Sequence, residues 1–449
     1  MEIKHLLFLQ MMAVAPAVSQ AQPSSLEAEA PLLTLDAAVS IALENNRLVK
    51  NSSLETQKLD LQVDSMRSYR LPQFQFAVLG GLPMQGIDFT FPAGSFGTYE
   101  ATGPIPSTDS VIHTPSQFTT YTTAAVDQPI TQQHKIGLRI RATELGRELV
   151  GEDLRRERQR IAADVRNAYF DLVATQAAVD AAREVVTTLE EAQRVTAEYQ
   201  IQQVVLRADA LEVDARFLRA RYELSMAENG LATQRESLNH LLGRDLTTPF
   251  RVDKSPEESA PELSLEDARR KAMENRPEVR EARLKEQQAD VDRRLAKAEY
   301  IPDLSLSVRY LGLNNVEVLP THVGMAGFLL TWEPFTWGRR GNAVAEKTRT
   351  LEQARNGVQE TESQIDVEVG MKYRRWQESG LLLTATRIGH EAALEQFRLA
   401  SNRYKERAVL VRDLLQAQAR TADASHQYQE ALSSYWSALA ELNRAMGEE

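Results

Sequence analysis

The residues that most often carry enzymatic or metal chemistry show no functional spacing in this sequence. Histidine could bind a metal or move protons, and the chain has seven: His5, His113, His134, His240, His322, His390 and His426. None belongs to a His-Glu-x-x-His pattern, which would place two ligands on one helix face. Neither a Gly-x-Ser-x-Gly nucleophile motif nor a glycine-rich phosphate loop before a helix occurs. We therefore expect no enzyme, no cofactor and no metal site.

Composition excludes further classes. Cysteine is absent from the 449 residues, which removes disulfides, thiolate metal sites and thiol nucleophiles. The same absence predicts no lipid anchor, because bacterial lipoproteins are acylated on a cysteine. The net charge of −11 disfavours nucleic acid as a partner.

The first 21 residues have the pattern of a signal peptide. Lys4 and His5 precede a mostly apolar run over 6–18, and Ser19 and Ala21 are small residues suited to cleavage after Ala21. An uncleaved membrane anchor is the alternative, but the run is shorter than a bilayer span requires. We expect an exported protein.

An internal duplication organises the rest of the chain. Residues 33–78 align with residues 263–308 without a gap, and matched positions include Leu33 with Leu263 and Pro72 with Pro302. The similarity resumes after about 25 extra residues in the first copy, where Tyr169 matches Tyr373. Asp209 likewise matches Asp413. Two copies of one unit predict a subunit with pseudo-twofold character.

Both copies predict the same order of elements. Helices are expected over 35–45, 48–70, 135–200 and 208–242 in the first copy, and over 265–275, 278–300, 343–403 and from a turn at 407–410 to 446 in the second. Alternating strands are expected over 73–78, 119–126, 304–310 and 324–332. Prolines mark the helix–strand joins, at Pro72, Pro129, Pro302 and Pro334. Glycine, proline, serine and threonine crowd residues 80–116, which predicts a long exposed loop.

The long helices have a coiled-coil seam. Apolar residues from Ile161 to Leu189 recur with a seven-residue period, with small alanines that allow close approach. A helix over 135–200 would span about 99 Å at about 1.5 Å per residue, so the two shorter helices of each copy must stack end to end beside it. We therefore divide the chain into a signal peptide (1–21), a first repeat (22–243), an equatorial linker (244–262) and a second repeat (263–449).

Four amphipathic strands cannot close a barrel, and lipid does not tolerate unpaired edges. Three chains would supply twelve strands. The expected fold is therefore mainly α with a small β part: duplicated long-helix hairpins form a segment of an α-barrel, and four strands join a trimeric 12-stranded transmembrane β-barrel. Aromatic residues at or near strand ends, Tyr310, Trp332 and Trp337, would meet the membrane interface.

This order of elements resembles the TolC family of outer-membrane efflux proteins. The paired openings Leu-Thr-Leu-Asp-Ala-Ala (33–38) and Leu-Ser-Leu-Glu-Asp-Ala (263–268) and the four prolines carry the resemblance. It implies a homotrimer that forms a channel through outer-membrane lipid and a helical tunnel across the periplasm. It also implies two protein partners, a periplasmic adaptor (membrane fusion) protein and an inner-membrane pump.

The resemblance further implies a gate at the periplasmic turns. In the family a tyrosine bonds an aspartate on a neighbouring helix, and inner aspartates ring the opening; by motif position these are Tyr404, Asp209 and Asp413. The family's gating arginine falls near Val409, so Arg407 or Arg412 would substitute. The alternative is that Asp209 and Asp413 are only helix N-caps. The alternative for the whole chain is a periplasmic coiled-coil scaffold or adaptor without a pore.

Overall fold

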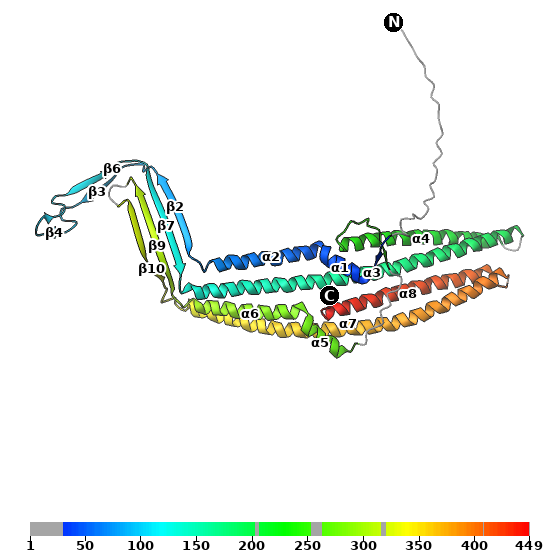
Figure 1. The fold of residues 1–449 in the computed structure, drawn as a ribbon. Coiled ribbons are helices and arrows are strands. Elements are labelled where there is room, and N and C mark those ends of the chain that lie inside the picture. Colours follow the sequence, from blue (N-terminus) through cyan, green and yellow to red (C-terminus); the bar gives the residue numbers. More distant parts are fainter. Residues whose placement is uncertain (1–29, 203–205, 253–262, 316–319, 407, 449) are drawn as a thin grey trace, which may run out of the picture. The chain divides into compact units, whose positions relative to one another are not determined.

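A computed structural model describes residues 30–202, 206–252, 263–315, 320–406 and 408–448 (Figure 1). The predicted signal peptide lies outside these residues, as do Arg407 and part of the predicted linker. The chain divides into two compact units. The first comprises Met1–Ala42, Asp164–Pro261 and Leu382–Ser437, and the second comprises Leu43–Ala163, Glu262–Leu381 and Ala438–Glu449.

The duplicated hairpins are confirmed. α1 (Leu35–Asn45) and α5 (Leu265–Asn275) have 11 residues each, and α2 (Arg47–Ser68) and α6 (Pro277–Ala298) have 22 each. The long helices α3 (Gln132–Ile201) and α7 (Arg339–Lys405) have 70 and 67 residues. The returning helices α4 (Arg207–Leu241) and α8 (Val411–Ala445) have 35 each. Corresponding helices of the two copies therefore have the same or nearly the same length, as the internal duplication predicts.

Caps set where the short helices begin. Thr34 Oγ1 accepts from the Ala37 amide at 3.3 Å, and Ser264 Oγ accepts from the Asp267 amide at 3.1 Å. α2 begins after Asn46, whose side chain accepts from the Leu48 amide at 2.8 Å. Its repeat partner Arg276 makes no such cap, but α6 begins with Pro277, which has no amide hydrogen to satisfy.

The strands form one antiparallel sheet in the second unit, in the order β10-β9-β7-β2. Its members are β2 (Gln73–Gly81), β7 (Thr119–Pro129), β9 (Asp303–Asn314) and β10 (His322–Thr331). The two hairpins meet through β7 and β9, where Ala124 pairs with Tyr310. β2 and β10 are the edges, so each leaves one row of backbone hydrogen-bonding groups without a partner strand in this chain.

Residues 80–116 are not a simple loop. They contain two small hairpins, β3 (Ile87–Phe91) with β6 (Ser110–Thr114) and β4 (Thr98–Tyr99) with β5 (Gly103–Pro104). Glycine supplies the left-handed backbone at Gly97 and Gly103, which lets these turns close. The glycine, proline, serine and threonine content correctly predicted turns in this segment. It did not predict the short strands of alternating polar and apolar residues between those turns.

In the first unit, α3 and α8 pack through aromatic rings. The rings of Phe170 and Trp436 are stacked with centroids 4.5 Å apart, and Ser433 Oγ bonds an Asp171 carboxylate oxygen at 2.5 Å. A short parallel pair, β1 (Leu32–Leu33) with β8 (Arg251–Val252), also belongs to this unit.

Candidate functional sites at the sheet and the helical turns

The four-stranded sheet has one mainly apolar face. Cross-strand partners share a face, so the register aligns Phe74 with Val126, Val308 and Ala326. The register places these apolar side chains on this face: Phe74, Phe76, Val78, Ala124, Val126, Leu304, Leu306, Val308, Tyr310, Ala326, Phe328 and Leu330. The polar residues on the same face are Thr120, Thr122, Gln128, Asn314 and His322. Phe74, Phe76 and Phe328 are 78%, 73% and 76% exposed. An exposed apolar surface of this extent on one side of a sheet marks an interaction face rather than a soluble surface.

The opposite face is more polar. Its polar residues are Gln73, Gln75, Thr119, Thr123, Asp127, Asp303, Ser305, Ser307, Arg309 and Thr331. It also carries the apolar or aromatic Ala77, Leu79, Tyr121, Ala125, Leu311, Leu313, Val323, Met325 and Leu329. The Arg309 guanidinium lies 3.8 Å from the Asp127 carboxylate. The sheet is therefore amphipathic, as its alternating sequence predicts.

The four prolines lie where the chain changes between helix and strand. Pro72 directly precedes β2 and Pro302 directly precedes β9. Pro129 is the last residue of β7, and Pro334 follows shortly after the end of β10. Pro72 and Pro302 disfavour continuation of the helices before them, and Pro129 and Pro334 have no amide hydrogen to donate to the ladder at the far ends of β7 and β10.

The joins of the two copies are bonded to each other in the second unit. Thr131 Oγ1 donates to the Pro302 carbonyl at 2.6 Å and accepts from the Leu304 amide at 2.8 Å. Lys135, near the start of α3, is 6% exposed, and its ammonium donates to Asp303 at 2.8 Å. These contacts tie the end of the sheet to the first turn of the long helix.

Of the three aromatic residues expected at or near strand ends, Trp332 and Trp337 lie outside the strands and Tyr310 lies within one. Trp332 follows the last residue of β10, and Trp337 is 99% exposed just before α7. Tyr310 lies inside β9, and its hydroxyl is 2.7 Å from Nδ1 of His322. Its expected place at the strand end was wrong because β9 continues to Asn314, beyond the alternating run that defined it.

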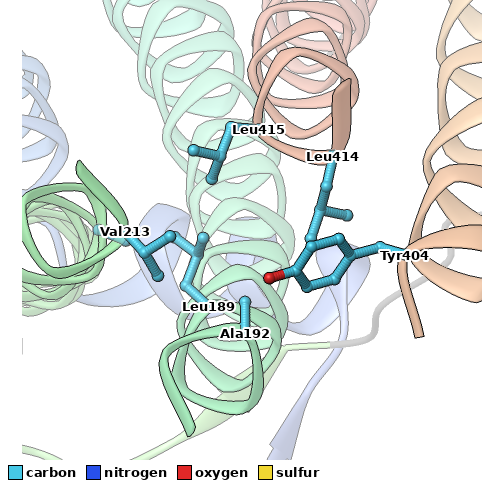
Figure 2. Packing of buried hydrophobic residues seen from close by; sticks show 7 residues of the cluster. Leu189, Ala192, Val213, Tyr404, Leu414 and Leu415 are labelled. Atoms are coloured by element: carbon cyan, nitrogen blue, oxygen red, sulfur yellow. The ribbon is translucent and has the colours of Figure 1, made fainter. Parts of the chain in front are cut away.

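At the helical turns of the first unit, Tyr404 is buried in an apolar cluster. It is 5% exposed and lies among Leu189, Ala192, Val213, Leu414 and Leu415, from α3, α4 and α8 (Figure 2). Figure 2 shows the Tyr404 ring directed from α7 toward α3. The cluster thereby joins the tips of both hairpins.

The Tyr404 hydroxyl bonds Thr196, not Asp209. The two hydroxyl oxygens are 2.9 Å apart, and Thr196 is 1% exposed. Burial raises the pKa of Tyr404 against the opposing hydrogen bond with Thr196, and the neighbouring Tyr199 and Asp209 add smaller increases. The tyrosine therefore stays protonated at neutral pH.

Asp209 and Asp413 lie at equivalent positions, but neither is an N-cap. α4 begins at Arg207 after Leu206, and α8 begins at Val411 after Leu410, so each aspartate is the third residue of its helix. The Asp413 carboxylate accepts from the Leu410 amide at 3.3 Å. At this position a carboxylate accepts a hydrogen bond from a backbone amide that has no partner within the helix. Its negative charge is also stabilised by the positive N-terminal end of the helix dipole. Arg412 beside it is exposed, while Arg407 lies outside the described residues.

Thr196 is the site residue that the sequence interpretation missed. Its signal was present, because Thr196 lies seven residues after Leu189 and so continues the apolar seam by one heptad. A hydroxyl at a seam position needs a buried partner, and Tyr404 supplies it.

No group of metal-binding side chains occurs among the described residues. Within the same ranges, no helix is both apolar enough and long enough to cross a membrane.

Comparison with known proteins agrees with this geometry. Residues 268–448 match the family model for outer membrane efflux proteins. A sequence search finds no match among the curated proteins.

Solved structures share the fold over most of the chain. CusC has 14% identity, covers 92% of this chain and 92% of its own, and superposes with a TM-score of 0.74. The Campylobacter jejuni CmeC outer membrane channel has 17% identity, coverage of 92% and 85%, and a TM-score of 0.71. The open state of the Neisseria gonorrhoeae MtrE outer membrane channel has 18% identity, coverage of 92% and 89%, and a TM-score of 0.70. The resemblance stated from the sequence is therefore confirmed: residues 268–448 match the outer membrane efflux protein model, and the chain has the fold of TolC-type outer-membrane channels.

Proposed function

We propose that this chain is one protomer of a trimeric outer-membrane channel that serves as the passive exit duct of a tripartite efflux system. An inner-membrane pump and a periplasmic adaptor would deliver the substrate. The protein would lie in the outer membrane and extend into the periplasm.

The amphipathic sheet with two open edges carries this proposal. Its apolar face suits contact with lipid chains, whereas its polar face suits a water-filled lumen. Edge strands β2 and β10 need partners, since unpaired backbone groups in lipid cost several kcal/mol each. If β2 of one copy pairs with β10 of the next, three copies close a barrel of twelve strands.

An apolar face of α4 supports several copies as well. Leu211, Leu218 and Tyr222 are 57%, 61% and 65% exposed in the first unit. Their spacing of seven and four residues places them on one side of the helix. In a closed ring of helices, this side of α4 would pack against a helix of the neighbouring copy.

The turns are proposed as the periplasmic gate. Tyr404, Asp209 and Asp413 gather near the hairpin tips, and a ring of three copies would repeat their charges around one axis. The proposed gate also includes Arg412 and Arg407, whose guanidinium groups would offset the aspartates.

A pair of adjacent substitutions tests the lipid-facing sheet. Phe76→Arg places a guanidinium on the apolar face, where an arginine near the membrane midplane costs about 2–4 kcal/mol. Gln75→Arg places the same charge on the polar face and is the matched control. We expect no trimer of the Phe76→Arg variant in detergent extracts of the outer membrane. The Gln75→Arg variant should be recovered as a trimer from the same extracts. Equal behaviour of the two variants, or wild-type protein released from the periplasm without detergent, would contradict the channel and favour the scaffold.

A further inference from the structure

The polar face of the sheet carries a charge couple at one place. Among the described strand residues of this sheet, the carboxylates and guanidinium groups belong to Asp127, Asp303 and Arg309. Asp303 is already bound by the Lys135 ammonium at 2.8 Å, where the sheet meets α3. Asp127 and Arg309 therefore dominate the charge of the remaining polar face.

The register explains how the couple forms. Asp127 lies opposite Ser307, and Arg309 lies opposite Ala125, so the two charged residues are diagonal neighbours on β7 and β9. Diagonal neighbours are within reach of long side chains. Arg309 Nε donates to Ser307 Oγ at 3.1 Å, and its Nη2 lies 3.8 Å from Asp127 Oδ1. The small Ala125 side chain leaves room for the guanidinium to turn toward Asp127.

The couple is not balanced in exposure. The Arg309 side chain is 54% exposed and the Asp127 side chain 27%. Asp127 Oδ1 is buried and has no hydrogen-bond partner in the described structure, so its charge relies on the guanidinium across the 3.8 Å gap. The polar face consequently presents the cation to water and keeps the carboxylate beneath it.

The duplication does not repeat the couple. Leu79 occupies the position of β2 that corresponds to Arg309, and Trp332 corresponds to Asp127. Each chain therefore contributes one couple, and a trimer would have three guanidinium groups at one level of the lumen. Rings of charged side chains determine which ions a pore admits.

We infer that Arg309, partly neutralised by Asp127, sets the ionic preference of the barrel lumen and favours anionic solutes at this level. This inference rests on the proposed function, because only a closed barrel turns the polar face into a lumen.

Reversal potentials in planar bilayers, measured across a KCl gradient, test it. Removing the carboxylate with Asp127→Asn leaves Arg309 uncompensated and should raise the chloride-to-potassium permeability ratio about twofold or more. Arg309→Gln should lower the ratio by a similar factor. The double variant should lie between the two single variants and below wild type, because it removes the more exposed guanidinium together with the less exposed carboxylate. The matched control is Asp60→Asn, which removes the carboxylate of another carboxylate–arginine pair, with Arg147 at 3.3 Å, on helices outside the sheet. Its effect should be smaller.

The outcomes separate the two ideas. Wild-type protein that forms no channel would overturn the proposed function and this inference together. A conducting channel with the same ratio in all variants, or one in which Asp60→Asn shifts the ratio as much as Asp127→Asn, would overturn only the role of the couple.

Discussion

The hydroxyl of Tyr169 donates to the backbone carbonyl of Leu33 at 3.0 Å, and so anchors the segment before α1 to the long helix α3. The second copy repeats this bond: the Tyr373 hydroxyl donates to the Leu263 carbonyl at 2.9 Å. The tyrosines and the leucines are matched positions of the duplication. The duplication has therefore kept a specific contact between distant residues, as well as the order of its elements.

Tyr169→Phe should destabilise the protein. Tyr169 is 1% exposed, so removing its hydroxyl removes a buried hydrogen bond and should cost about 0.5–1.5 kcal/mol. Tyr373 is less buried, and water can replace its hydroxyl, so Tyr373→Phe should cost less. Thermal unfolding in detergent measures both. Tyr99→Phe is the control, since Tyr99 donates to the Phe96 carbonyl in an exposed hairpin, and it should leave the midpoint unchanged. Equal midpoints for Tyr169→Phe and the control would contradict an anchoring role.

The tip contacts predict a change in conductance. The bond between Tyr404 and Thr196 joins two neutral hydroxyls, which gives about 0.5–1.5 kcal/mol per chain. If the cluster around Tyr404 holds the hairpin tips in a closed arrangement, Tyr404→Phe combined with Asp209→Ala should raise single-channel conductance in planar bilayers. Thr196→Val removes the same bond from the other side and should act in the same direction. Unchanged conductance in intact trimers would leave these residues with a packing role only.

Asp413 predicts a separate effect on cation block. The three Asp413 carboxylates of a trimer, gathered near one axis, would attract divalent cations. Their mutual repulsion would disfavour the closed arrangement. Asp413→Ala should therefore weaken block by divalent cations added from the periplasmic side. Glu395→Ala on α7 is a suitable control, because that carboxylate is already paired with Arg398 at 2.6 Å. Undiminished block by the Asp413 variant would argue against an aspartate ring.

Local patterns in the sequence predicted most of the fold. The prolines limited the helices, the alternation of Leu304 to Tyr310 predicted a strand, and the heptads predicted the long hairpins. The partner of Tyr404 could not be predicted in this way, because it depends on the register between α3 and α7, which are far apart in the chain. The alternative that Asp209 and Asp413 are N-caps was wrong by about one helical turn. The helices begin two residues before these aspartates, directly after the apolar Leu206 and Leu410.

The long first hairpin connection predicts surface exposure. Strands β2 and β7 are joined by residues that include Thr108, which is exposed. In the proposed topology this connection lies on the side of the membrane away from the helices. An epitope inserted at Thr108 should be labelled on intact cells, and labelling that requires permeabilisation would reverse the topology.

A buried ion pair in the second unit predicts loss of stability in acid. The Arg276 side chain is 10% exposed, and its guanidinium donates to the two Glu278 carboxylate oxygens at 3.0 and 2.9 Å. Burial acts to raise the pKa of Glu278, but the hydrogen bonds and charge of Arg276 outweigh it and hold that pKa below its usual value of 4.5. Since the folded pKa is depressed, the pair stabilises the fold fully above pH 4.5, and this contribution is lost as the pH falls through the folded value.

Glu278→Gln should therefore lower the unfolding midpoint at pH 7. The expected loss is about 1 kcal/mol, the difference between a charged and a neutral hydrogen bond. Below pH 4.5 the midpoints of wild type and variant should converge, because the wild-type carboxyl also becomes neutral. Glu55→Gln removes one partner of an exposed pair with Lys58 on α2, and it should leave the midpoint nearly unchanged at both pH values. A Glu278→Gln deficit that stays constant from pH 7 into the acid range would show that the substitution acts through packing, not through the charge of the pair.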